Sequence, residues 1–494
     1  MTEHATASPR PAPASAAAAW LRRRVQSRVR RITGWAGGLG AADPFVRAAV
    51  AVFLLLRLAG MASARPSLYP DSKSYRVKGT WLDFYLTSFY GGHAPRPWGV
   101  TIWMALWPGD LSIVLAQTLL SFVAWSTLAL VVAGGIRNVA VRRVVVVLLL
   151  LVACTAQVAS WDGVILGESV SVSCGLLTLA MALRFSRVPS WGRAAAFLAP
   201  ALWFSMTRPN VFVILVVWAL GMVIIGLARR EAFLWGSVAA GLVAISLYSY
   251  AYNVRTSDAW TKAYGYSKSV VAYAYPVGVY NPVAESVLVD LRRSDAPRCM
   301  IPVSPASVTL AGMTRWAAHT SRTCPGMNEW ASRNWIRWWA AWLLHHPGDA
   351  LTIIEAELPN SLSPSVWGTV YAPVPNSVSQ LFFGSVALPQ DPVKTKTYRT
   401  EPVLLWLAAA VALAFVGAAR KGSRRDSWTP DSVLGLTAVG AVTSAISSAL
   451  LIQTSPFEVA QESLAAAVLL TTSLVVAVGL GLDRVAPEPT SAMS

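Results

Sequence analysis

Charged residues are scarce in this sequence of 494 residues. Only 13% of the chain is Asp, Glu, Lys or Arg, whereas about a quarter of an ordinary soluble domain is charged. Acidic residues are the scarcer sign, with 24 against 41 basic residues. So few charges exclude an ordinary soluble domain, and the 55% hydrophobic content indicates a membrane protein.

Motifs of nucleotide-dependent and metal-dependent proteins are also missing. The sequence has neither a glycine-rich phosphate loop nor a dinucleotide-binding fingerprint, so no nucleotide cofactor is expected. The neighbouring His345 and His346 have no third ligand at a recognisable spacing, so we expect no metal. No soluble domain interleaves basic and aromatic residues, which argues against nucleic acid as a partner.

Long hydrophobic runs are what the sequence does contain. A helix needs about 20 apolar residues to cross a bilayer, and such runs occupy residues 45–62, 111–134, 143–160, 163–184, 232–252, 402–419, 431–452 and 462–482. A further run, 194–228, is too long for one span and too short for two full ones. Because Pro209 interrupts it in "TRPN", we expect a hairpin of two short helices.

Basic residues predict the orientation of these helices. An excess of Lys and Arg marks the cytoplasmic side, and the N-terminal tail carries "RRRVQSRVRR" without the features of a signal peptide. A hairpin turn near Arg208 and Pro209 places four further basic clusters on that side, those that follow runs 111–134, 163–184, 194–228 and 402–419. The sequence therefore predicts an all-α polytopic protein of the cytoplasmic membrane, with about ten transmembrane helices and both termini inside.

This topology divides the chain into segments. They are a basic cytoplasmic tail (1–44), a transmembrane module (45–252) with a first outer loop (63–110), a mixed extracytoplasmic domain (253–401), C-terminal transmembrane helices (402–482) and a cytoplasmic tail (483–494). Cys299 and Cys324 both fall in the extracytoplasmic domain, where an oxidising compartment would allow a disulfide. Two unpaired thiols are the alternative.

A tryptophan-rich stretch, "NEWASRNWIRWWAAWLL", lies in the same domain. One interpretation is a helix in the membrane plane, with Arg333 and Arg337 opposite Trp and Leu. The other is a helix that packs its tryptophans into the core of the domain. Neither interpretation makes the stretch catalytic.

Polar residues at membrane depth are costly and indicate function by default. Arg57 interrupts "FLLLRLAG" near the outer end of the first span, and Glu168 lies near the outer end of the fourth. Snorkelling to the interface is the alternative for Arg57, and a salt bridge to an arginine is the alternative for Glu168. Arg208 lies at the hairpin turn beside Asn210, where its guanidinium is suited to hold a phosphate.

The first outer loop begins with "LYPDSKSYRVKG", residues 68–79. Its carboxylate, Asp71, lies at the membrane boundary among tyrosines, where it is suited to accept a proton from a hydroxyl nucleophile. The alternative is structural, because an aspartate in this position also makes a fair N-cap for a helix that starts after Pro70.

The order of these motifs resembles that of the GT-C membrane glycosyltransferases, in particular the bacterial relatives of protein O-mannosyltransferases and the lipid A aminoarabinose transferases. The resemblance covers about residues 45–230. It consists of an arginine late in the first span, Asp and Tyr in the outer loop, "RPWG" before the second span, "GES" at the fourth and "TRPN" at the hairpin. It implies an active site facing outward, a polyprenyl-phosphate-linked sugar donor and a glycan, lipid or protein acceptor.

The resemblance also implies roles for individual residues. Asp71 corresponds to the general base, with Asp83 in reserve because many relatives have two adjacent acids where this chain has Asp71 followed by serine. The donor phosphate would be held by Arg208, Arg57 and Arg96, with Tyr75, Glu168 and Asn210 in support. Because the leaving group is a lipid phosphate, one base suffices for an inverting transfer, and no cofactor is expected.

Two other functions stay open from the sequence. A transporter or flippase of lipid-linked or envelope precursors would also have many spans and broken helices, although no internal repeat relates the two halves. A non-catalytic scaffold for envelope polymers would need none of Asp71, Glu168 and Arg208. Transfer of a sugar from a polyprenyl-phosphate donor by the purified protein would separate the enzyme from both.

Overall fold

The computed structural model describes residues 43–63, 66–68, 72–75, 96–208, 211–229, 231–264, 268–274, 276–278, 281–303, 316, 319–362 and 464–485. Within these ranges the regular structure is helical, and an isolated parallel β-bridge joins Ser67 and Val164. The expected all-α membrane character is thus confirmed for the described chain. The predicted spans 402–419 and 431–452 lie outside it.

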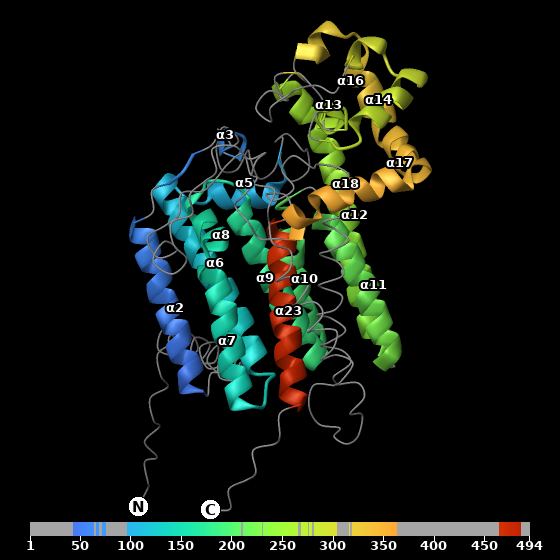
Figure 1. Ribbon diagram of the computed structural model, residues 1–494. Coiled ribbons are helices and arrows are strands. Elements are labelled where there is room, and N and C mark those ends of the chain that lie inside the picture. The colour runs from blue at the N-terminus through green and yellow to red at the C-terminus, as the bar shows by residue number, and fades with distance from the viewer. Residues whose placement is uncertain are drawn as a thin grey trace, which may run out of the picture.

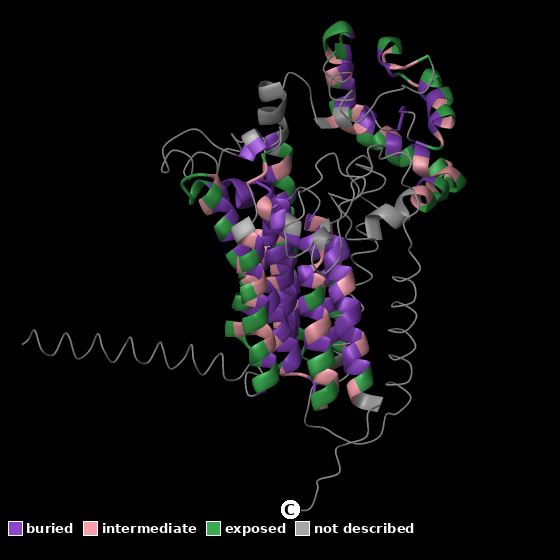
Figure 2. Ribbon diagram, turned by 60° about the vertical axis from the view of Figure 1, so that its left-hand side comes forward, coloured by how far each residue is buried: buried purple, intermediate pink, exposed green. Residues whose placement is uncertain are grey.

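Five of the described helices are long and apolar enough to cross a membrane. They are α2 (Pro44–Ser63), α6 (Asp110–Ala133), α9 (Glu168–Arg187), α12 (Ala232–Tyr264) and α23 (Leu464–Val485). Shorter helices pack with them to form a bundle (Figure 1), namely α7 (Val139–Cys154), α10 (Trp191–Ser205) and α11 (Val211–Arg229). The bundle interior is apolar and buried, and exposed residues lie along its outside (Figure 2).

The long run 194–228 forms two helices, as predicted. Helix α10 ends at Ser205 and α11 begins at Val211, so the break includes Arg208. At the end of α10, the backbone N–H of Thr207 donates to Phe204 O at 3.1 Å, and the Thr207 hydroxyl donates to the same oxygen at 2.6 Å. These bonds satisfy a carbonyl that the end of the helix leaves open.

One end of the bundle, which we call the Asp43 end, is held by charged groups. The Asp43 carboxylate lies 3.5 Å from Arg142 Nε and 3.4 Å from Arg143 Nε at the start of α7. The backbone N–H of Asn138 donates to Asp483 Oδ1 at 2.6 Å. The start of α2, the start of α7 and the end of α23 therefore lie together.

The opposite end, which we call the Arg57 end, is less regular than the sequence predicted. The runs 143–160 and 163–184 were expected to meet almost directly, but α7 stops at Cys154 and α9 starts at Glu168. The chain between them forms α8 (Ala156–Ala159) and the 3₁₀ turn η1 (Ser160–Gly163). Two short helices also lie at this end (Figure 1), α3 (Ser72–Tyr75) and α5 (Trp98–Ala105).

A helical unit, residues 268–362 where described, lies beyond the Arg57 end and is joined to the bundle by α12 (Figure 1). It comprises α13 (Lys268–Ala274), α14 (Ala284–Arg293), η2 (Arg298–Met300), α16 (Met327–Trp330), the π-helical turn η3 (Ala331–Trp335), α17 (Ile336–His345) and α18 (Pro347–Leu362). Its core is separate from that of the bundle and rich in tryptophan, with Trp330, Trp335, Trp339 and Trp342 all buried. The membrane-plane interpretation of the tryptophans is therefore wrong, because these side chains are used inside the unit.

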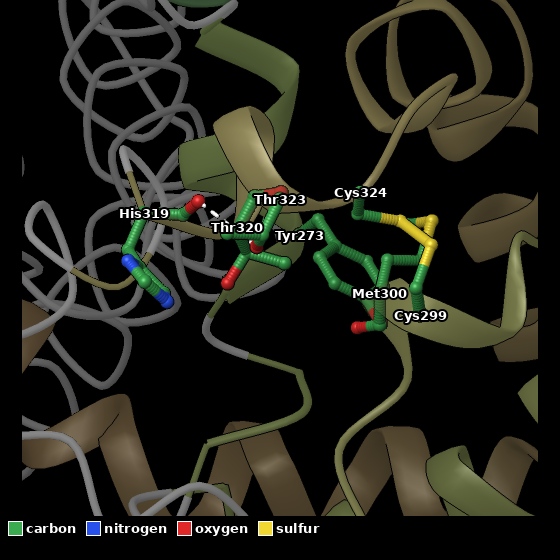
Figure 3. The surroundings of a disulfide bond; sticks show 7 residues. All are labelled: Tyr273, Cys299, Met300, His319, Thr320, Thr323 and Cys324. Carbon is green, nitrogen blue, oxygen red and sulfur yellow. Dashed lines mark hydrogen bonds between the residues drawn. A yellow bond between two sulfur atoms is a disulfide. The ribbon is translucent and has the colours of Figure 1, made fainter.

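A disulfide joins Cys299 and Cys324 within the unit (Figure 3). The two Cα atoms are 5.5 Å apart, and Cys324 is part of the tryptophan-rich core. Beside the disulfide, the Tyr273 hydroxyl donates to Met300 O at 2.8 Å. The cross-link thus connects η2 to the segment just before α16.

Candidate functional site

The first ion pair at the Arg57 end joins α2 to η1. The Arg57 guanidinium contacts the Asp162 carboxylate and the Ser121 hydroxyl, and its Nη1 donates to Ala153 O at 3.2 Å. Both charged residues are 5% exposed. Arg57 therefore does not snorkel to the interface, the alternative considered from the sequence, but binds three other elements inside the bundle.

Asp162 binds both Arg57 and Ser169, and it was not identified as a site residue from the sequence. Its second carboxylate oxygen accepts from the Ser169 hydroxyl at 2.5 Å. Burial raises the pKa of the Asp162 carboxyl above its usual value, and the Arg57 charge opposes that shift most strongly. The available signal was that Asp162 is one of only two acids in the stretch 143–184, the other being Glu168.

The second ion pair joins α9 to the turn after α10. Arg208 donates from Nη2 to Glu168 Oε1, and the side chains are 6% and 1% exposed. The salt bridge considered for Glu168 is thus present, and its partner is the arginine predicted to hold a phosphate. As the first residue of α9, Glu168 also lies where the helix dipole favours negative charge.

The two ion pairs are connected through consecutive residues of α9. Glu168 binds Arg208 and the next residue, Ser169, binds Asp162. Three residues after Glu168, the hydroxyl oxygens of Ser171 and Thr207 lie within hydrogen-bond distance, 2.9 Å apart. The start of α9 therefore fixes the position of Arg208 both through its charge and through the residue before it in the chain.

Tyr75 of α3 lies beside Gly167, the residue before Glu168 of the second ion pair. A Cβ atom at Gly167 would lie 3.5 Å from the Tyr75 hydroxyl oxygen and 3.7 Å from Thr207 O, so three segments meet at this point. Arg96 lies over the Tyr75 ring, with its Cζ 5.0 Å from the ring centroid. Tyr75 itself is buried.

Gly99, in the "RPWG" motif, has a clear structural role. Its backbone N–H donates to Met206 O at 2.8 Å, and a Cβ atom there would be only 2.5 Å from the same oxygen. No residue with a side chain fits without moving the backbone. The close contact holds α5 against the turn that carries Arg208.

A cavity lies beside the first ion pair. It is lined by residues of α2, α6, α7, α8 and η1, including Arg57, Thr118, Cys154 and Asp162. Its volume of about 20 Å³ has room for one water molecule. A sugar does not fit in it as it stands.

The structure brings together five of the predicted site residues: Arg57, Tyr75, Arg96, Glu168 and Arg208. The proposed base Asp71, its reserve Asp83, and Asn210 lie outside the described residues. Asp71 directly precedes α3 in the sequence. Sequence reasoning missed Asp162 and the serines that bind the charged groups, because a serine in a helix has no distinctive pattern.

His345 and His346 were also considered as metal ligands. Among the described residues, no group of three His, Cys, Asp or Glu side chains is arranged to hold a metal. His346 Nε2 lies 2.9 Å from Asp290 Oδ2, and its ring stacks on Trp342 with centroids 4.7 Å apart. His346 thus ties the end of α17 to α14 in the helical unit.

No model of a known protein family and no curated protein sequence matches this chain. Its function is therefore inferred from the residues at the Arg57 end and from the motifs to which they belong.

Proposed function

We propose that the protein is a membrane glycosyltransferase of the GT-C type, which moves a sugar from a polyprenyl-phosphate donor to the hydroxyl of a glycan, lipid or protein. The site is the Arg57 end of the bundle, facing the outside of the cytoplasmic membrane. Transfer from a sugar phosphodiester needs a group that binds the departing phosphate and a base that takes the acceptor proton.

The observation that carries the proposal is the distribution of buried charge. In the described chain the buried charged residues are Asp43, Arg57, Asp162, Glu168 and Arg208. Asp43 lies at one end of the bundle and the other four lie together at the opposite end. Charged side chains buried inside a bundle of membrane helices are costly, and they are a sign of function.

This one-sided arrangement favours an enzyme over a carrier. Transporter sites lie near the bilayer midplane, where alternating access can open them to either side. Here the ionic groups lie at the bundle end that carries α3, α5 and the helical unit. Such a site lies toward one side of the membrane, as transfer to an external acceptor requires.

Arg208 is the proposed ligand of the donor phosphate. Glu168 holds one edge of its guanidinium, which fixes its direction before any donor arrives. Arg96 lies over the ring of Tyr75 and is a second proposed ligand of the same phosphate. An arginine that is oriented in advance loses little entropy on binding.

Asp71 is the proposed general base. Asparagine caps a helix about as well as aspartate, so Asp71→Asn should keep any capping bond while it removes the proton acceptor. We expect turnover to fall by about 10²-fold or more, with donor binding little changed and Asp83→Asn mild. Near-normal turnover of Asp71→Asn, with damage only in Asp71→Ala, would assign Asp71 to capping.

The activity itself is tested with the full chain in lipid nanodiscs. Polyprenyl-phosphate mannose or arabinose, radiolabelled in the sugar, is added together with an envelope extract that supplies acceptors. The proposal predicts that label moves to an acceptor with wild-type protein and not with Arg208→Ala. If label stays on the donor but changes leaflet in proteoliposomes, the protein is a flippase.

A further inference from the structure

The turn η3 and helix α17, which follow one another directly, share two faces of different character. The face that bears Trp335, Trp339 and Trp342 is buried in the core of the helical unit. The opposite face is exposed and bears, at helical spacing, Arg333, Ile336, Arg337, Ala340 and Leu344. Ile336 is 72% exposed and Leu344 82% exposed, so this face presents large aliphatic side chains together with two arginines.

The exposed leucines continue around the corner between α17 and α18. Helix α18 starts at Pro347, directly after His346, and its Leu351 is 65% exposed. The corner therefore presents Leu344 and Leu351 from two helices that meet at an angle (Figure 1). We call the pair, with the residues between them, the α17–α18 corner.

The contact of α18 with the bundle sets the position of the corner. Helix α18 contacts α23, and from there it runs across the Arg57 end to reach α17 beyond α12 (Figure 1). Both α12 and α23 are long and apolar enough to cross a membrane. Lipid headgroups must therefore surround the bundle near the level at which α18 leaves it.

We infer that the α17–α18 corner rests on the leaflet at the Arg57 end, with Leu344 and Leu351 inserted between anionic phospholipids and Arg337 bound to their phosphates. Arg337 precedes Leu344 by two helical turns, or about 10 Å along the axis. That separation places a guanidinium at headgroup level when the leucines are at the acyl boundary.

The charges on this face fit that partner. Arg333 is held by Glu329 at 2.8 Å, whereas within the described residues Arg337 has no carboxylate within ion-pair distance. An anionic lipid phosphate supplies the missing negative charge. The contact would hold the helical unit over the Arg57 end whatever reaction takes place there.

Spin-label accessibility in the full chain tests the inference. Leu344→Cys and Leu351→Cys are each labelled in nanodiscs of phosphatidylglycerol and phosphatidylethanolamine, with Val303→Cys as a control because Val303 is 94% exposed in the same unit. Leu220→Cys, on α11 and 60% exposed, is the lipid-facing reference. The unlabelled cysteines Cys154 and Cys174 are buried.

We expect the ratio of accessibility to oxygen over accessibility to a water-soluble nickel complex to be several-fold higher at the corner than at Val303, and close to that at Leu220. Adding Arg337→Gln should lower the ratio at Leu344 when phosphatidylglycerol is present. A corner that matches Val303 would overturn the inference, as would a label shielded from both reagents, which would mean that protein covers the corner. An unchanged ratio at Leu344 in the Arg337→Gln background would show that Arg337 does not bind lipid phosphate.

Discussion

The Arg57 end of the bundle and the helical unit beyond it use polar groups in opposite ways. At the Arg57 end, Arg57 and Arg208 are buried, and each is paired with a buried carboxylate on another element. In the unit, the pair Arg333–Glu329 lies on one helix with side chains 74% and 64% exposed. The unit is held instead by packed tryptophans and a disulfide.

This difference indicates where specificity lies. Exposed pairs contribute little to stability, whereas a buried pair is tolerated only when both partners are present and well placed. Buried pairs that connect four or more elements make the Arg57 end sensitive to single changes. The unit should tolerate the loss of any one surface charge, so the two regions can be distinguished by mutation.

The largest effect is expected from breaking the Glu168–Arg208 pair. Glu168→Gln removes the buried carboxylate that Arg208 binds and should destabilise the protein by about 3–5 kcal/mol. The double variant Glu168→Gln/Arg208→Met removes both charges and should recover much of that loss. Thermal unfolding in detergent measures all three proteins.

The matched control is Glu329→Gln in the helical unit, which breaks the Arg333 pair. Because both side chains are exposed, we expect a change below about 1 kcal/mol. Equal destabilisation by Glu168→Gln and Glu329→Gln would contradict the contrast between the two regions.

The second-largest effect is expected from removing the disulfide. The pair Cys299→Ser/Cys324→Ser opens a cross-link between residues 25 apart in sequence and should cost the unit about 2–4 kcal/mol. Hydrogen exchange should quicken in α14 and α17 but not in α6 and α9, since the bundle core is separate. Equal acceleration in both regions would mean that they unfold as one.

Gly99→Ala should act on the Arg57 end by overpacking. The new methyl group would lie 2.5 Å from Met206 O, and relieving such a contact costs about 1–3 kcal/mol. Because Met206 leads into the turn that bears Arg208, sugar transfer should fall more than stability. Gly192→Ala is the control, since no atom lies within 4 Å of its added Cβ. Full transfer activity in Gly99→Ala would show that the packing of α5 does not affect the site.

The smallest effect is expected at the Asp43 end, as a dependence on pH. Burial alone would raise the pKa of Asp43, but its hydrogen bonds and the neighbouring charges of Arg143 and Arg142 outweigh burial and lower it. A carboxyl whose pKa is lowered by folding stabilises the protein above its unfolded pKa, and that contribution is lost as pH falls through the folded value. Asp43→Asn should therefore flatten the acid side of the profile of unfolding free energy against pH. Identical profiles for wild type and Asp43→Asn would show that the contacts of Asp43 with Arg142 and Arg143 contribute nothing to stability.

Much of the fold could be predicted because hydrophobic runs and Pro209 have direct structural consequences. The helices α2, α6 and α23 follow the predicted runs closely, whereas α12 continues past the predicted end of its run at residue 252 to Tyr264. The junction between α7 and α9 could not be predicted from hydropathy, since Trp161, Val164 and Leu166 are apolar but lie in turns. Their conformation depends on the long-range contacts of Asp162 and of the Ser67–Val164 bridge.

The site was predicted in part for a similar reason. Arg57, Glu168 and Arg208 stand out because charge is rare in apolar runs, but the sequence does not say which carboxylate pairs with which arginine. Pairing depends on how α9 packs beside η1 and the turn after α10. The tryptophan helix shows the same limit, because its spacing fits a membrane face as well as a protein core.

Donor binding to Arg208→Lys is the most direct test of the proposed site. Lysine keeps the charge opposite Glu168 but loses the planar fork of donors, so we expect polyprenyl monophosphate to bind about tenfold more weakly or worse. Arg333→Lys is the matched control and should bind like wild type, with thermal melting confirming that both variants fold. Equal affinity of wild type and Arg208→Lys for the lipid phosphate would contradict the claim that Arg208 is a phosphate ligand.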